Sequence, residues 1–151
     1  MKVLLQRVSR ASVTVNNEIT GDIGKGLVAL VGIAAGDSGK DAKYLAEKTV
    51  NLRVFEDSEG KFNLSVLDIK GELLVVSQFT LLADALKGRR PSFMDAAPPE
   101  IAEPLIEYYV SELKACGLPV AGGRFRQHML VEIHNDGPVT IMLDSRDKYP
   151  Q

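Results

Sequence analysis

Apolar residues in several segments of this chain recur at every second position, as at Val13 and Val15 or at Val139, Ile141 and Leu143, and this alternation is the feature that most limits its fold. An alternation with period two is typical of β-strands that bury one face. Only two segments change to the helical period, residues 38–52 and residues 100–116. Two helices among about seven strands, joined mostly by hairpins, predict an α+β fold with a largely antiparallel, barrel-like β-sheet.

Strand-like segments are spread over the whole chain. Residues 27–37 and 72–84 are apolar at consecutive positions, which predicts buried strands, and the second segment is the most hydrophobic of the chain. We therefore expect segment 72–84 at the centre of the sheet. Asn16 and Asn17 offer turn chemistry between two further strands. The strands are expected at 2–8, 11–26 (as a hairpin), 27–37, 53–57, 72–84, 128–134 and 139–143.

The stretch HNDGPVT joins the last two expected strands. Asn135, Asp136 and Gly137 are typical residues of a β-hairpin turn. Pro138 follows directly, and it lacks the backbone N–H that a returning strand would offer to its neighbour. It also makes the Gly137–Pro138 peptide bond a candidate for the cis form. The sequence thus predicts a hairpin that gives up one ladder hydrogen bond at its turn.

Length and composition are those of one globular domain, expected over residues 1–151. The 18 basic and 20 acidic residues give a net charge of −2, so nucleic-acid binding would have to use local patches. The single cysteine, Cys116, excludes an intrachain disulfide and favours a reducing compartment. The chain has neither an apolar stretch of about 20 residues nor a signal-peptide core, so we expect no membrane span and a cytoplasmic location.

The motif Ser77-Gln78-Phe79-Thr80 follows directly on the apolar run Leu73–Val76. Strand alternation would place Ser77 and Phe79 on one face, with Gln78 and Thr80 on the other. Buried polar groups need partners, so these residues either cap the sheet edge or line a pocket beside backbone amides. Such a pocket is suited to stabilise an oxyanion. Thr80 is a candidate nucleophile, but no base for it can be read from the sequence.

Histidines and cysteines form no metal-ligand pattern in the sequence. His128 and His134 are expected on one strand, about 20 Å apart at about 3.3 Å per residue, too far to bind one metal ion. Cysteine pairs and an HExxH motif are absent. We therefore expect no metal and no cofactor.

Basic residues gather in two places. Lys87, Arg89 and Arg90 lie in a long loop rich in proline and glycine, and Arg124 and Arg126 precede the last strands. Each cluster alone is typical of a solvated surface. Two such clusters on either side of a polar pocket would suit a phosphate backbone.

Four motifs together resemble the D-aminoacyl-tRNA deacylases, first described as D-tyrosyl-tRNA deacylases. They are LLQRVSRASVTV, GELLVVSQFTLLAD, KGRRPSF and NDGPVT. Each string alone is weakly specific, but their order and spacing cover nearly the whole chain. The sequence is therefore identified as a member of this family.

The resemblance implies a cytoplasmic homodimer that hydrolyses the ester between a D-amino acid and the terminal adenosine of tRNA. It also implies activity on glycine mischarged on tRNA, because an achiral residue cannot be told from a D one. Gly137-Pro138 matches the family's Gly–cis-Pro motif, which is implied to enter the active site of the other subunit. There its carbonyl oxygens would hold the substrate amino group and leave no room for an L side chain.

The active-site motif of the family carries over to Ser77, Gln78, Phe79 and Thr80. Two mechanisms are open for it: Thr80 acts as a nucleophile, or backbone amides near Phe79 and Thr80 assist while the adenosine 2′-hydroxyl helps the attacking water. The lack of a readable base favours the second mechanism. The candidate tRNA contacts in the matching loop are Lys87, Arg89 and Arg90.

Two positions depart from the family pattern. Arg126-Gln127-His128 stands where small or acidic residues are more usual, and Leu82 stands where an aromatic residue is common. Both lie outside the two motifs and put loop contacts, not the activity, in question. The competing hypotheses are a general esterase with Thr80 or Ser77 as nucleophile, and a non-catalytic RNA-binding module.

Overall fold

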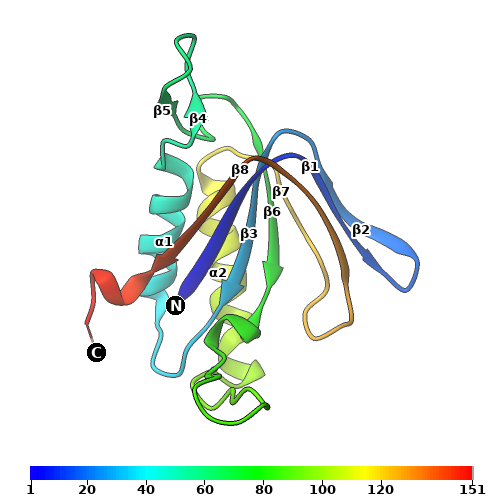
Figure 1. Ribbon diagram of the computed structural model, residues 1–151, viewed down its shortest axis with the longest axis vertical. Helices are drawn as coiled ribbons and strands as arrows, with labels where there is room; N and C mark the ends of the chain where they lie inside the picture. Colours follow the sequence, from blue (N-terminus) through cyan, green and yellow to red (C-terminus); the bar gives the residue numbers. More distant parts are fainter. Residues whose placement is uncertain (151) are drawn as a thin grey trace.

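The computed structural model describes residues 1–150, which form eight strands and two α-helices (Figure 1). In chain order these are β1 Lys2–Val15, β2 Glu18–Ile23, β3 Gly26–Gly32, α1 Gly39–Asn51, β4 Phe55–Glu56, β5 Phe62–Leu64, β6 Glu72–Ser77, α2 Pro99–Ala115, β7 Val120–Gly122 and β8 Leu130–Asp144. Two short 3₁₀ helices complete the fold, η1 Phe79–Leu82 and η2 Ser145–Asp147. The α+β class expected from the sequence is confirmed.

Strand β1 organises the main sheet because it pairs along both of its edges. It is antiparallel to β2 and β3 on one edge and antiparallel to β8 on the other. Beyond β3 the sheet continues with β6 and β7, each parallel to its neighbour, in the order β2-β1-β3-β6-β7. The antiparallel pairs therefore gather around β1. The parallel pairs follow from α1 and α2, which serve as the crossovers that parallel strands require.

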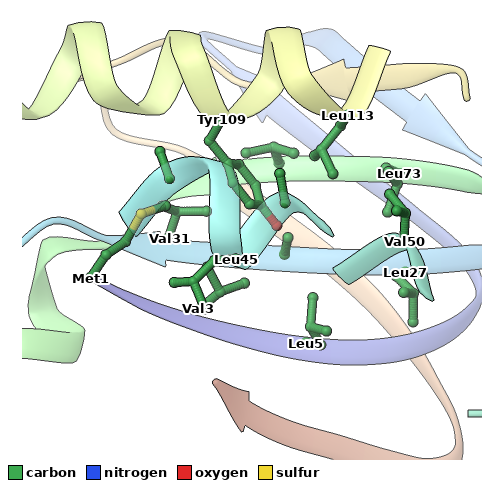
Figure 2. Packing of buried hydrophobic residues seen from close by; sticks show 14 of the residues in the cluster. Met1, Val3, Leu5, Leu27, Val31, Leu45, Val50, Leu73, Tyr109 and Leu113 are labelled. Atoms are coloured by element: carbon green, nitrogen blue, oxygen red, sulfur yellow. The ribbon is translucent and has the colours of Figure 1, made fainter. Parts of the chain in front are cut away.

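Both faces of this sheet are buried, which explains the consecutive apolar residues of its central strands. One face packs against the helices, and Figure 2 shows Leu45 and Tyr109 from α1 and α2 in one cluster with Leu27 and Val31 from β3. The other face is covered because β1, β2 and β8 curl over it. The buried residues of this second core are Val8, Ala11, Val13, Val15, Ile23, Val28, Leu74 and Val76. The sheet is accordingly barrel-like, as expected.

The hairpin expected in the motif HNDGPVT is not formed, and this prediction is wrong. Strand β8 passes through the motif without reversing, and both of its halves pair with β1. Residues 136–139 form a bulge opposite a single β1 residue, Arg7. The register pairs on either side are Gln6↔Thr140 and Val8↔Asn135. Residues within a bulge are not paired in the ladder, so the lack of an N–H at Pro138 costs the sheet no hydrogen bond.

Residues that are typical of helix termini stand at the start of both helices and after the end of α2. Ser38 is the N-cap of α1, and its N–H donates to the Asp41 carboxylate at 2.9 Å. Pro99 occupies the first turn of α2, where its missing N–H has no helical partner to lose. Gly117 follows the end of α2 with φ of +86°, a conformation that favours glycine.

One polar contact is fully buried between the two helices. Thr49 of α1 and Tyr109 of α2 are both 0% exposed, and their hydroxyl oxygens lie 2.8 Å apart. The Thr49 hydroxyl donates to the Leu45 carbonyl at 2.7 Å, so Tyr109 must be the donor in the bond that the two hydroxyls share. Burial raises the pKa of the Tyr109 hydroxyl, which keeps it protonated as this donor.

This assignment of donor and acceptor predicts an asymmetric pair of mutations. Thr49→Val removes the acceptor and leaves the buried Tyr109 hydroxyl unpaired, which should lower the free energy of unfolding by about 1–3 kcal/mol. Tyr109→Phe leaves Thr49 bonded to Leu45 and should cost less, about 1 kcal/mol. The double variant should lose less than the sum, as measured by urea unfolding. Strict additivity would contradict the shared hydrogen bond.

Candidate active site

Strand β6 ends at Ser77, and the chain then leaves the sheet. The Gln78 N–H donates to the Val31 carbonyl at 2.7 Å, and the Leu81 N–H donates to the Gln78 carbonyl at 3.2 Å to begin η1. The expected alternation of side chains from Ser77 to Thr80 is therefore wrong beyond Ser77. Strand parity does not apply once the backbone turns into a 3₁₀ helix.

A glycine in β3 allows η1 to lie against the end of the sheet. A Cβ atom on Gly32 would be 2.5 Å from Leu82 Cδ2 and 3.1 Å from the Gln78 carbonyl oxygen. Leu82 is itself buried, and it anchors η1 to the core. The close approach of Gly32 thus fixes where the Ser77–Thr80 motif stands at the end of β6.

The first turn of η1 presents two free backbone donors. Among residues 1–150, neither the Phe79 N–H nor the Thr80 N–H has a hydrogen-bond acceptor. This is expected for the first N–H groups of a helical turn, which have no partner inside it. Two adjacent free N–H groups are suited to stabilise negative charge on a carbonyl oxygen.

A hollow of about 630 Å³ opens beside this turn. Ser77, Gln78 and Phe79 line it, together with Phe93 from the long loop before α2. The rings of Phe79 and Phe93 meet edge to face, with centroids 5.0 Å apart and an interplanar angle of 71°. Three of the four residues expected in the site therefore share one cavity wall. Thr80 is not among the lining residues.

Thr80 has an amide neighbour rather than a base. The Gln78 side-chain amide donates to its hydroxyl oxygen. In the described part of the chain no histidine or carboxylate forms a hydrogen bond with the Thr80 hydroxyl. A threonine hydroxyl without an adjacent base is a weak nucleophile.

His128 and Arg126 also line the hollow. Arg126 belongs to the second basic cluster that the sequence offered beside a polar pocket, whereas sequence reasoning missed His128. Strand β8 begins at Leu130, so the expectation that His128 lies on a strand with His134 is wrong. The segment before β8 instead brings Phe125, Arg126 and His128 to the cavity wall. Arg126 has φ of +64°, which is uncommon for a residue other than glycine. The departure from the family pattern at these positions was the available signal.

The Gly137–Pro138 bond is cis, and a buried arginine holds the bulge around it. Arg7 is 6% exposed and donates to the Asp136 carbonyl at 3.2 Å and the Val54 carbonyl at 2.9 Å. The Asn135 amide closes the bulge by donating to the carbonyls of Arg7 and Val139, both at 3.0 Å. Arg7 thus has a positioning role that sequence reasoning missed.

Within one chain the bulge lies far from the hollow. Arg7, opposite the bulge, pairs with Leu27 of β3, which pairs with Leu73 of β6. Ser77 lies four residues further along β6, about 13 Å away along the strand, and β8 and β6 are three strand spacings, about 14 Å, apart. The two candidate motifs therefore do not meet in a single chain.

The basic loop residues are exposed and stand outside the cavity wall. Lys87, Arg89 and Arg90 belong to a loop closed by paired backbone hydrogen bonds of 2.8 Å between Asp84 and Ser92. None of the three lines the hollow. Phe93, three residues after Arg90, does line it, so the loop returns to the site.

Comparison with known proteins decides the family. The family model for D-Tyr-tRNA(Tyr) deacylase matches residues 4–144. The chain belongs to this family. A D-aminoacyl-tRNA deacylase of Roseiflexus sp. (strain RS-1) is 61% identical over 145 residues, which cover 96% of this chain and 94% of that protein.

Solved structures agree with this membership. The structure named "c-Myc DNA Unwinding Element Binding Protein" is 44% identical, with a TM-score of 0.89 over 95% of this chain and 98% of that one. Another, named "Structural Analysis of a probable eukaryotic D-amino acid tRNA deacylase", has a TM-score of 0.83 over 94% of this chain and 97% of that one. At 16% identity it shows likeness of fold alone. The family and the hydrolase class expected from the sequence are confirmed.

Among residues 1–150, neither helix combines the length and the apolar character of a membrane span. No three side chains of histidine, cysteine, aspartate or glutamate in that range come together as a metal-binding group.

Proposed function

We propose that this protein hydrolyses the ester of D-aminoacyl-tRNA, and of glycine mischarged on tRNA, to release the free amino acid and tRNA. The observation that carries the proposal is the pair of free N–H groups of Phe79 and Thr80, at the edge of a hollow lined by Ser77 and Gln78, in a member of this family. We place the enzyme in the cytoplasm and assign it no cofactor.

In the proposed reaction water adds to the ester carbonyl carbon. The carbonyl oxygen takes negative charge and accepts hydrogen bonds from the Phe79 and Thr80 N–H groups. Collapse of this intermediate breaks the bond to the ribose oxygen, which leaves with a proton as tRNA. The adenosine 2′-hydroxyl assists the water, because the structure offers Thr80 no base. Gln78 holds the Thr80 hydroxyl in place beside the amides.

Chirality is selected in this proposal by a second copy of the chain. Gly137-Pro138 enters the hollow of the partner in a homodimer, where its carbonyl oxygens accept from the substrate amino group. The space left beside the turn fits a D side chain or none, but not an L side chain. The separation of bulge and hollow within one chain supports this arrangement, since only another subunit can bring them together. Outside the hollow, Lys87, Arg89 and Arg90 are proposed to contact tRNA.

Deacylation of matched D- and L-aminoacyl-tRNA tests the proposal. The D ester and the glycyl ester should be hydrolysed much faster than the L ester. A general esterase would instead hydrolyse simple activated esters without RNA and form a covalent intermediate. A non-catalytic RNA-binding module would bind tRNA and hydrolyse neither ester. Equal rates on the D and L esters would overturn the proposal.

Thr80→Ala separates the two mechanisms for this site. The variant keeps the Phe79 and Thr80 backbone N–H groups, so it should retain kcat within about ten-fold of wild type. A nucleophilic Thr80 would instead require a loss of about a thousand-fold or more. Single-turnover deacylation of D-aminoacyl-tRNA measures the difference, with circular dichroism as the control for folding. Loss of activity in a folded variant would favour the nucleophile.

Gly137→Ala should damage function more than stability. A Cβ atom at this position, where φ is +119°, would lie 2.8 Å from Arg7 Nη2 and would displace the exposed turn. We expect a fall in D-aminoacyl-tRNA deacylation of about a hundred-fold, with the melting temperature lowered only slightly. A Gly137→Ala variant with a lowered melting temperature but unchanged deacylation activity would contradict the proposed role of the turn.

Mixing variants tests whether the site is shared between subunits. Ser77→Phe fills the hollow and should also be inactive. A heterodimer of Gly137→Ala and Ser77→Phe chains would contain one site free of both changes if the turn acts across the interface. Co-expression with two affinity tags should therefore restore hydrolysis. If each chain used its own turn, both sites of the heterodimer would be defective. Absence of restored hydrolysis would therefore show that the turn does not act across the interface.

A further inference from the structure

A second hollow adjoins the candidate active site. It has a volume of about 270 Å³ and lies between β6, β7 and α2. Ser77, Ile106, Phe125 and Met129 line both hollows, so the two share a wall, and we call the two hollows together the trough. Nothing in the proposed hydrolysis step uses this second compartment.

The charged side chains that line the trough are all basic. Lys114 and Arg124 line the second hollow, and Arg126 lines the first. No aspartate or glutamate lines either compartment, although the whole chain has 20 acidic and 18 basic residues. A cavity that excludes acidic side chains in a slightly acidic protein is suited to bind an anion.

The two cations of the second hollow are available to a ligand. Lys114 lies in the last turn of α2 and forms no ion pair with any of residues 1–150. The helix offers it no partner either, since no acidic residue lies three or four positions away. Arg124 contacts Glu18 at 3.6 Å, but both side chains are half or more exposed, so this pair is weak.

Backbone without side chains forms the wall of the second hollow at Gly122 and Gly123. A Cβ atom on Gly123 would clash with Met129 Sδ and would push apart the wall that the two compartments share. The shape of the second hollow thus depends on glycine at position 123, with Lys114 and Arg124 beside it.

We propose that the second hollow is the binding site for the nucleotide that precedes the terminal adenosine, with Lys114 and Arg124 as contacts to its phosphate backbone. This inference rests on the proposed function, which puts the ester of the terminal adenosine at Ser77–Thr80. One phosphodiester links that adenosine to the nucleotide before it. The preceding nucleotide must then lie next to the first hollow. The second hollow offers two cations there, Lys114 without an ion pair among residues 1–150 and Arg124 in a weak, exposed one.

The experiment compares three substrates that carry the same D-amino acid. D-aminoacyl-tRNA and the D-aminoacyl trinucleotide CCA contain the preceding phosphates, whereas D-aminoacyl-adenosine lacks them. For Lys114→Gln/Arg124→Gln, kcat/KM on the two phosphate-bearing substrates should fall about ten-fold relative to the adenosine ester. The slope of log kcat/KM for tRNA against log salt should become shallower by about 0.7 per lost contact.

Two further variants serve as controls. Lys43→Gln/Arg53→Gln removes the same charge from exposed positions that line neither hollow, and it should leave the ratio between substrates as in wild type. Lys114→Arg/Arg124→Lys keeps both charges, so its ratio of kcat/KM on the phosphate-bearing substrates to kcat/KM on the adenosine ester should lie close to that of wild type. Equal losses on all three substrates, or an equal effect of the control charges, would overturn the phosphate site while D-selective hydrolysis by wild type stands. A wild type that hydrolyses none of the three substrates overturns the proposed function as well.

Discussion

The pairing of one strand, β1, with both halves of β8 is the constraint on which the rest of this structure depends. Since β1 continues without a break through 14 residues and pairs with β8 along nearly all of them, β8 does not reverse at its turn-like motif and accommodates the surplus residues 136–139 as a bulge. A bulge exposes backbone groups, and here the guanidinium of Arg7 and the amide of Asn135 engage several of them. These hydrogen bonds attach the bulge to the sheet and fix its position opposite Arg7 of β1.

The same sheet sets the place of the hollow. β3 and β6 run parallel, so their carboxyl ends reach the same edge of the sheet, and η1 begins there. The crossovers through α1 and α2 leave the long loop before α2 and the segment before β8 near this edge, where they supply Phe93 and His128. The two candidate motifs, Ser77–Thr80 and Gly137-Pro138, thus lie toward opposite ends of the strands. The proposed homodimer is the simplest way to unite them.

Local signals in the sequence were reliable where local physics decides the structure. The helical periods of residues 38–52 and 100–116 and the apolar run at the start of segment 72–84 depend on neighbouring residues, and they are found as the helices α1 and α2 and the buried strand β6. The hairpin predicted at Asn135–Pro138 was wrong because hairpin turns and bulges use the same residue types. Only the distant partner strand distinguishes them. Arg7 was missed for the same reason, as its acceptors lie 129 and 47 positions away.

The charge of the trough explains two features of the candidate site together. A carboxylate base beside Thr80 would repel both the phosphates of tRNA and the developing oxyanion, so a site built from amides and hydroxyls is consistent with a polyanionic substrate. The same positive surroundings disfavour the ammonium group of an aminoacyl ester. Acceptors for that group must then come from outside the trough. In the proposed homodimer the Gly137-Pro138 turn of the second copy would offer carbonyl oxygens. Asp136 next to it has a carboxylate that contacts Arg7 at 3.3 Å and is still 53% exposed. Electrostatics therefore favours the same cross-subunit arrangement as the strand register.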